Sequence, residues 1–371
     1  MTEVNPAALS SMVVWGGFLL SLLLGLVAAK TNFCTMGAVS DVLNMGDWTR
    51  MRMWLLAIAI AILGTVALQI AGWIDVSKSI YTGSNLLWLS HVLGGLLFGI
   101  GMVLASGCGS KTLIRLGGGN LKSLVVLLVM AVVAYMSLRG VLGVLRVNWI
   151  DTVALTLPSA QDLPSLAASL LGMQRSQVLP WLGGGIALLL MAFVFADAQA
   201  RSGDVVIGGV VIGLVIVAGW VLSGYLGHVL EDPSTLEEKF YATNSGRMES
   251  MSFVAPQAYL LELLMLWSDK SRVMTLGIAS VLGMYCGALL WALFSGSFRV
   301  ESFNGSEDML NHLLGAVLMG FGGVLALGCT VGQGLSGIST LALGSLLSLL
   351  AIIAGAVLGM RYQEWRIERA G

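Results

Sequence analysis

Long apolar runs separated by short polar stretches dominate the chain. A helix needs roughly 17 to 25 residues to cross a bilayer. Nine runs fit that length, near 10–29, 54–74, 86–107, 121–143, 181–197, 205–230, 273–295, 312–328 and 340–360. Another apolar stretch, 253–267, is shorter and begins beside Pro256, so we expect a re-entrant or interfacial piece there. The pattern predicts an all-α polytopic membrane protein with about nine transmembrane helices and short re-entrant or broken helices.

Composition supports this class. Hydrophobic residues make up 57% of the 371 residues, charged residues 11%, and the mean hydropathy is +0.89, whereas a soluble domain carries about 25% charge. The N-terminal "MTEVNPAALSS" lacks the lysine or arginine of a secretory signal, so we expect the first run to be an uncleaved anchor. A net charge of −1 without a basic patch gives no reason to expect a nucleic-acid partner.

The chain contains an internal repeat. "HVLGGLLFGIGMVLASGC" (91–108) aligns without a gap with "HLLGAVLMGFGGVLALGC" (312–329), with 11 of 18 positions identical at an offset of 221. The match extends more weakly from 31–48 to 250–267 and from 54–64 to 273–283. We therefore expect a first repeat over 1–145, a connecting loop and linker helix over 146–204, and a second repeat over 205–371.

The linker helix sets the relative orientation of the two repeats. Four spans followed by one linker span place the second repeat upside down in the membrane, which predicts two inverted pseudo-repeats. Inverted repeats build transporters whose substrate site lies near the midplane between the halves. With the N-terminus outside, inward segments hold eleven lysines and arginines and outward segments hold eight, so we expect a cytoplasmic C-terminus.

Two of the four cysteines end equivalent apolar runs. Cys108 in "LASGCGSKT" and Cys329 in "LALGCTVGQG" are each followed by glycine and small polar residues. A half-helix starting there would direct free N–H groups and its positive end at an anion. From the residues alone, Cys34 in "TNFCTMGAVSD" fits a ligand and a core cysteine equally, and Cys286 fits the core. The expected substrate-binding residues are Cys34, Cys108, Gly109, Cys329, Thr330, Gly332 and Gln333.

Other chemistries fit the residues poorly. No C-x-x-C or zinc spacing is present, so we expect no metal, no cofactor and no catalytic residue. "GCGSKT" is not a phosphate-binding loop, because Ser110 stands where that motif needs glycine before the lysine. Two alternatives remain: a membrane thiol redox protein that uses Cys34 and Cys108, and a soft-metal carrier.

The motifs "NFCTMGAVSD", "LASGCG" and "LGCTVGQGLSG" resemble those of the YeeE/YedE sulfur-transport family of bacterial inner-membrane proteins. The resemblance covers nearly the whole chain and includes the cysteine-free "SMSFVAPQ" in the second half. It implies an hourglass-shaped helical bundle that takes up thiosulfate or a related small sulfur anion, with Cys34, Cys108 and Cys329 along the path. It also implies a cytoplasmic TusA-like sulfurtransferase as a partner. Some relatives are linked to selenium metabolism, so a selenium compound is an alternative substrate.

Thiosulfate chemistry suits neutral thiols. A thiol is a weak donor and a polarizable contact for a soft sulfur atom, whereas a thiolate would repel a dianion. Import against an inside-negative potential is opposed by about 4.6 kcal/mol per 100 mV for two charges. Among the apolar stretches, Glu262 and Asp41 are the candidate proton carriers, and the alternative source of driving force is consumption of the anion inside.

Overall fold

The computed structural model describes residues 5–197 and 201–370 of the chain. In this part the α-helices are α1 (Pro6–Lys30), α2 (Thr35–Asn44), α3 (Thr49–Ile70), α4 (Trp88–Leu104), α5 (Gly109–Gly117), α6 (Leu121–Arg139), α7 (Val141–Leu145), α8 (Leu163–Leu171), α9 (Arg175–Phe195), α10 (Gly203–Val221), α11 (Ala255–Met265), α12 (Leu276–Phe294), α13 (Ser306–Leu325) and α14 (Leu343–Ala370). A 3₁₀ turn, η1 (Val76–Lys78), follows α3, and π-helical turns occur at η2 (Arg146–Ile150), η4 (Leu222–Leu226) and η5 (Gly332–Gly337).

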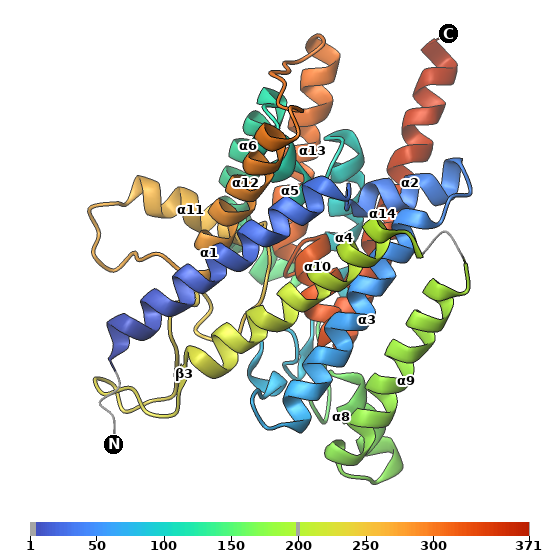
Figure 1. Cartoon of the computed structure of the whole chain (residues 1–371). Coiled ribbons are helices and arrows are strands. Elements are labelled where there is room, and N and C mark those ends of the chain that lie inside the picture. The colour runs from blue at the N-terminus through green and yellow to red at the C-terminus, as the bar shows by residue number, and fades with distance from the viewer. Residues whose placement is uncertain (1–4, 198–200, 371) are drawn as a thin grey trace.

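Among the described residues, the strands form two short antiparallel pairs. β1 (Asn85–Leu86) pairs with β2 (Leu155–Thr156), and β3 (His228–Val229) pairs with β4 (Lys239–Phe240). We call the end of the molecule at which α1 begins the N-terminal face, and the end at which α14 finishes the C-terminal face. The β3–β4 hairpin lies near the start of α1, so it belongs to the N-terminal face (Figure 1).

The predicted fold class is confirmed. Nine helical segments of the described residues are long and apolar enough to cross a membrane: α1 with α2, α3, α4 with α5, α6, α9, α10 with η4, α12, α13 and α14. The apolar stretch at 253–267 forms α11, whose 11 residues are too few to span a bilayer.

Polar residues mark the starts of several of these apolar helices. Asn5 accepts hydrogen bonds from the amides of Ala7 and Ala8 at 3.1 and 3.2 Å at the start of α1. Asn120 accepts from the amide of Ser123 at 2.9 Å at the start of α6. These side chains satisfy N–H groups that no helical carbonyl can reach, so they fix where each span begins.

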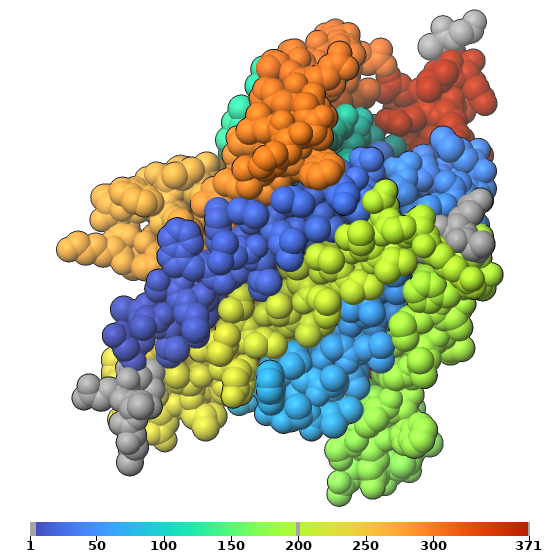
Figure 2. Space-filling view, viewed as in Figure 1, coloured from blue at the N-terminus to red at the C-terminus, as the bar shows by residue number. Residues whose placement is uncertain are grey.

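Helices of the first half pack on helices of the second. α1 lies against α12 and α10 lies against α3, while α4 lies against α14 and α13 lies against α6. In the repeat, α1 corresponds to α10, α3 to α12, α4 to α13 and α6 to α14. The α1–α12 contact therefore corresponds to the α10–α3 contact, and the α4–α14 contact to the α13–α6 contact, as a pseudo-two-fold axis requires. Figures 1 and 2 show α1, α10, α3 and α9 side by side across the face in view.

Glycines bring α4 and α13 into backbone contact. A Cβ atom added to Gly94 would lie 2.7 Å from the carbonyl oxygen of Gly322, and one added to Gly101 would lie 2.7 Å from that of Gly315. No side chain fits at such distances, and small residues are what allow membrane helices to approach this closely. With the offset of 221, Gly315 is the repeat counterpart of Gly94, and Gly322 is that of Gly101. Gly94 therefore contacts the counterpart of Gly101, and Gly101 contacts the counterpart of Gly94.

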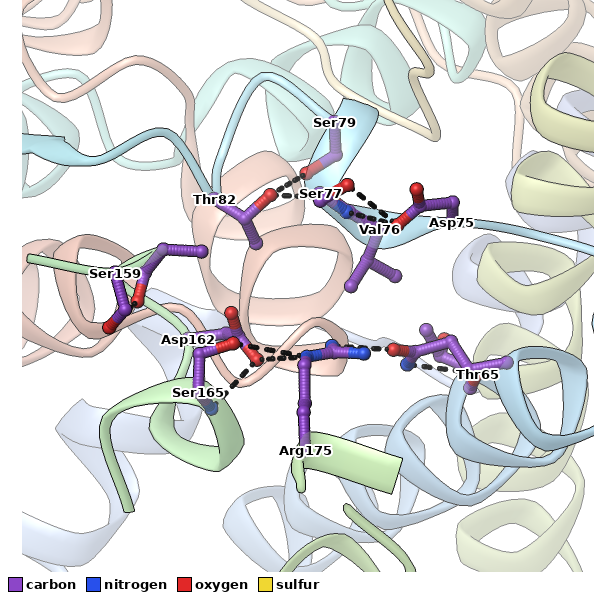
Figure 3. Close-up of polar contacts among 12 residues, drawn as sticks. Thr65, Asp75, Val76, Ser77, Ser79, Thr82, Ser159, Asp162, Ser165 and Arg175 are labelled. Atoms are coloured by element: carbon purple, nitrogen blue, oxygen red, sulfur yellow. Dashed lines mark hydrogen bonds and ion pairs between the residues drawn. The ribbon is translucent and has the colours of Figure 1, made fainter. Parts of the chain in front are cut away.

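Polar contacts on the N-terminal face attach the linker helix to the first half (Figure 3). Arg175, the first residue of α9, donates from Nε to Asp162 Oδ2 at 3.0 Å and from Nη2 to Gln69 Oε1 at 2.8 Å. Asp162 also caps α8 by accepting from the amide of Ser165 at 3.3 Å. The start of α9 is therefore held against the end of α3.

Candidate functional site

Two broken helices place Cys108 and Cys329 inside the protein. α4 ends at Leu104, and Cys108 is the N-cap residue of α5, which begins four residues after Ala105. α13 ends at Leu325, and Cys329 stands between that end and η5. Both side chains are buried. Irregular backbone at this depth is tolerated where protein covers it or where it lines a cavity.

The helices before Cys34, Cys108 and Cys329 all end in the same Schellman motif. The backbone two positions before each cysteine is left-handed, with φ of 52°, 56° and 57° at Asn32, Ser106 and Leu327. The amide of the residue just before each cysteine donates to the carbonyl five positions earlier, with N–O distances of 3.1, 2.7 and 2.9 Å from Phe33, Gly107 and Gly328. Left-handed residues other than glycine are uncommon and concentrate at functional sites. Cys34 therefore shares the backbone context of the other two cysteines.

The sulfur atoms of Cys34 and Cys329 accept hydrogen bonds from the helical turns that follow them. Cys34 Sγ accepts from the amide of Gly37 at 3.3 Å, and Cys329 Sγ accepts from the amide of Gly332 at 3.4 Å. Cys286, in contrast, lies within α12. The structure thus separates three cysteines at helix breaks from one cysteine within a continuous helix.

Cys108 connects the two halves. Thr330 Oγ1 donates to Cys108 Sγ at 3.2 Å, across 222 residues of sequence, and Ser110 Oγ lies 3.2 Å from the same sulfur. Thr330 directly follows Cys329 in the chain, so this contact places Cys108 beside the helix break that holds Cys329.

The remaining site residues predicted from the sequence lie close around these cysteines. Gln333 donates from Nε2 to the carbonyl of Ala326, which closes the break after α13, while its buried Oε1 accepts no hydrogen bond within the described part of the chain. A Cβ on Gly332 would lie 2.7 Å from Ser252 Oγ, and one on Gly109 would lie 3.3 Å from Met130 Cε. The absence of a side chain at these two glycines therefore lets Ser252 and Met130 pack directly against the backbone of the site.

Basic side chains lie near Cys34. The charges of Lys111 and Arg50 both act on this thiol. Arg50 is paired with Asp41, with Nη2 at 2.6 Å from Oδ1. Lys111, in the first turn of α5, is half-buried and makes no ion pair among the described residues. An unpaired ammonium this close to the helix break gives this side of the cysteines a positive charge.

A cavity of about 190 Å³ approaches Cys329 from the N-terminal face. Its walls include Tyr81, Arg146 and Glu249, and it extends to Leu327 and Gly328, which directly precede Cys329. The loop between β4 and α11 forms one wall, through Asn244, Ser245 and Glu249. The cavity therefore ends next to the helix break that holds Cys329.

A second cavity of about 170 Å³ lies beside the first and shares Asn244 and Tyr259 with it. Here Glu262 Oε1 lies 3.8 Å from Arg139 Nε and 3.4 Å from Arg272 Nη1. Glu262 thus takes part in ion pairs, as Asp41 does with Arg50, although the sequence offered both as candidate proton carriers.

The sequence is similar to known sulfur transporters. A family model described as "Sulphur transport" matches residues 30–358. The thiosulfate transporter TsuA of Escherichia coli (strain K12) is 26% identical over 340 residues, covering 87% of each chain. The TsuA of Spirochaeta thermophila is 24% identical over 355 residues, covering 92% of this chain and 97% of that one. With its polytopic helical fold and a family match over most of its length, the chain belongs to the sulphur transport family.

Proposed function

We propose that this protein imports thiosulfate, or a closely related small sulfur anion, across the bacterial inner membrane along a path marked by Cys34, Cys108 and Cys329. The observation that carries the proposal is the position of Cys108, which accepts a hydrogen bond from Thr330, the residue after Cys329, across the two halves. The relatives named as thiosulfate transporters support the substrate class.

The proposed path uses neutral thiols without forming a covalent bond. Each buried thiol offers a soft sulfur contact and a weak donor to the anion. The hydroxyl of Thr330 and the amide of Gly109, at the start of α5, would serve the oxygen atoms. Release from each position requires weak binding at several sites in succession, as conduction through a pore does.

Growth of a sulfur-starved bacterium tests the function directly. Cells that lack their own thiosulfate uptake should grow on thiosulfate when they express this gene and fail without it. Sulfate and selenite serve as parallel sources and reveal whether a selenium compound is the better substrate. Equal growth with and without the gene on thiosulfate would contradict the proposal.

Replacing Thr330 with valine should lower thiosulfate uptake by up to about tenfold, because one hydrogen bond to Cys108 Sγ is worth about 1 kcal/mol. Thr330→Ser keeps the hydroxyl and should retain most uptake. Thr340→Val is a matched control, since Thr340 is also buried but donates to the carbonyl of Gly337 at 2.7 Å. Initial rates of labelled thiosulfate uptake at matched expression measure the difference. Equal losses in Thr330→Val and Thr340→Val would exclude a specific role for Thr330.

We further propose that the first repeat (1–145) and the second (205–371) are joined through the connecting segment 146–204, with the C-terminus in the cytoplasm. The exchanged packing of helices from the two halves supports this division. In a cysteine-free background, Thr235→Cys in the β3–β4 hairpin should react with an impermeant maleimide added outside, and Ser297→Cys between α12 and α13 should not. Both should react once the membrane is permeabilised. Protection of Thr235→Cys alone in intact cells would reverse the proposed orientation.

The partner we propose on the cytoplasmic side is a TusA-like sulfurtransferase that removes the sulfur of the imported anion. Asp41 and Glu262 are both engaged in ion pairs, which favours consumption of the product over proton carriage by these two groups. The unpaired Lys111 on the Cys34 side would attract the anion toward that partner.

A further inference from the structure

The carboxylate of Glu249 lines the cavity that leads to Cys329. It accepts from the amide of Ser245 at 2.7 Å and from that of Asn244 at 3.5 Å. The backbone amide of Glu249 donates to Ser223 Oγ at 3.1 Å, and Ser223 donates back to its carbonyl. Glu249 is therefore held in place between the loop before α11 and η4. Its acidic side chain borders the cavity that we propose as part of the anion path.

Glu249 forms no ion pair among the described residues, whereas Arg146, Arg139 and Arg272 nearby each do. Arg146, in the same cavity, lies 3.5 Å from Asp151 between Nε and Oδ2, and Arg146 Nε has no hydrogen-bond partner. Arg139 and Arg272 in the neighbouring cavity contact Glu262. The other titratable groups facing the cavity are Tyr81 and Tyr259, each of which interacts electrostatically with Glu249.

Partial burial raises the pKa of the half-buried Glu249 above its ordinary value, although the hydrogen bonds from Ser245 and Asn244 oppose this shift. The raised pKa means that the protonated form persists to higher pH than for an exposed glutamate. An anion in the same cavity would repel the ionised carboxylate and favour the protonated form further. A proton and a divalent anion therefore stabilise each other there.

Tyr81 connects this carboxylate with the cysteine site. It lines the same cavity as Glu249, and its hydroxyl would lie 3.6 Å from a Cβ on Gly332. Tyr81 therefore stands between Glu249 and the helix break. Protonation of Glu249 removes a negative charge from the approach to Cys329.

We propose that Glu249 binds a proton when a divalent sulfur anion enters this cavity, so that the proton and the anion bind together. The inference rests on the proposed function, since it takes the cavity as part of the anion path. The proton comes from water on the N-terminal face and returns to water when the anion leaves. No covalent bond to the anion forms or breaks.

Calorimetry of thiosulfate binding to the purified full-length protein tests this inference. Titrations in two buffers of different ionisation enthalpy, repeated across a pH series, report the number of protons taken up. At pH values above the pKa of Glu249, the wild type should take up nearly one proton for each thiosulfate bound. Its affinity for thiosulfate should then fall by up to about tenfold for each unit of rising pH. Glu249→Gln keeps an oxygen acceptor for the Ser245 amide, and it should bind thiosulfate with no proton uptake and no pH dependence.

Glu238→Gln is the matched control, because Glu238 lies on the same face but pairs with Lys78 and His228 in the hairpin region outside both cavities. It should take up protons as the wild type does. Thiosulfate binding to the wild type without proton uptake would overturn the inference and leave the proposed function intact. Proton uptake by Glu249→Gln equal to that of the wild type would do the same. A wild type that binds no thiosulfate at any pH would overturn both.

Discussion

Replacing Cys108 or Cys329 with alanine is expected to reduce thiosulfate uptake to background. Both thiols are buried at breaks between helices of equivalent halves, and Cys108 holds the hydrogen bond from Thr330. Alanine removes the soft sulfur atom and its donor while adding no volume, so the fold should persist. The loss would therefore arise from an interrupted path.

The other two cysteines provide the internal comparison. Cys34→Ala should impair uptake, because Cys34 shares the preceding Schellman motif with Cys108 and Cys329 and the amide contact with Cys329. Cys286→Ala should have little effect, since Cys286 lies within a continuous helix. Labelled thiosulfate uptake at matched membrane expression measures all four variants. Wild-type rates in Cys108→Ala would remove the basis of the assigned path.

Accumulation of thiosulfate in proteoliposomes should depend steeply on membrane potential. Two negative charges moving against an inside-negative potential are opposed by about 4.6 kcal/mol per 100 mV, which lowers the equilibrium ratio of inside to outside anion roughly 2,000-fold. Accumulated label at a series of imposed potassium-diffusion potentials gives the charge moved per anion. If the proton bound at Glu249 travels with the anion, one net charge moves and the effect falls to about 50-fold.

In cells, consumption should supply the missing driving force. Deleting the cytoplasmic sulfurtransferase should depress net accumulation of label even though the membrane protein is intact. Unchanged accumulation in that strain, together with thiosulfate driven above equilibrium by an inward proton gradient in liposomes, would show that proton coupling drives uptake. Liposomes without protein serve as the control for leakage.

Hydropathy and the internal repeat were sufficient to predict the membrane class and the number of candidate spans. They were sufficient because the bilayer imposes a length and an apolar composition on each spanning helix. Breaks next to Cys108 and Cys329 could also be expected, because glycine and small polar residues interrupt the apolar runs there, although each helix ends before its cysteine, at Leu104 and Leu325.

The local geometry of the site could not be predicted. Ser106 and Leu327 carry no sequence sign of a left-handed backbone, since glycine or asparagine would normally occupy such positions. The hydrogen bond from Thr330 to Cys108 joins residues 222 positions apart and depends on the packing of both halves. Glu249 lies outside the apolar runs, so a search for ionisable groups within spans finds Glu262 and Asp41 instead.

The glycine crossing of α4 and α13 restricts how the path can open. Sliding one helix along the other would drive the side chains beside Gly94 and Gly322 into the opposing backbone. We therefore expect α4 and α13 to keep their relative position. A motion that rocks one whole half against the other would have to break this contact. Along the path proposed above, an anion would then pass through small displacements of α2, α5 and η5, the short elements that follow the three cysteines, while α4 and α13 keep their contact.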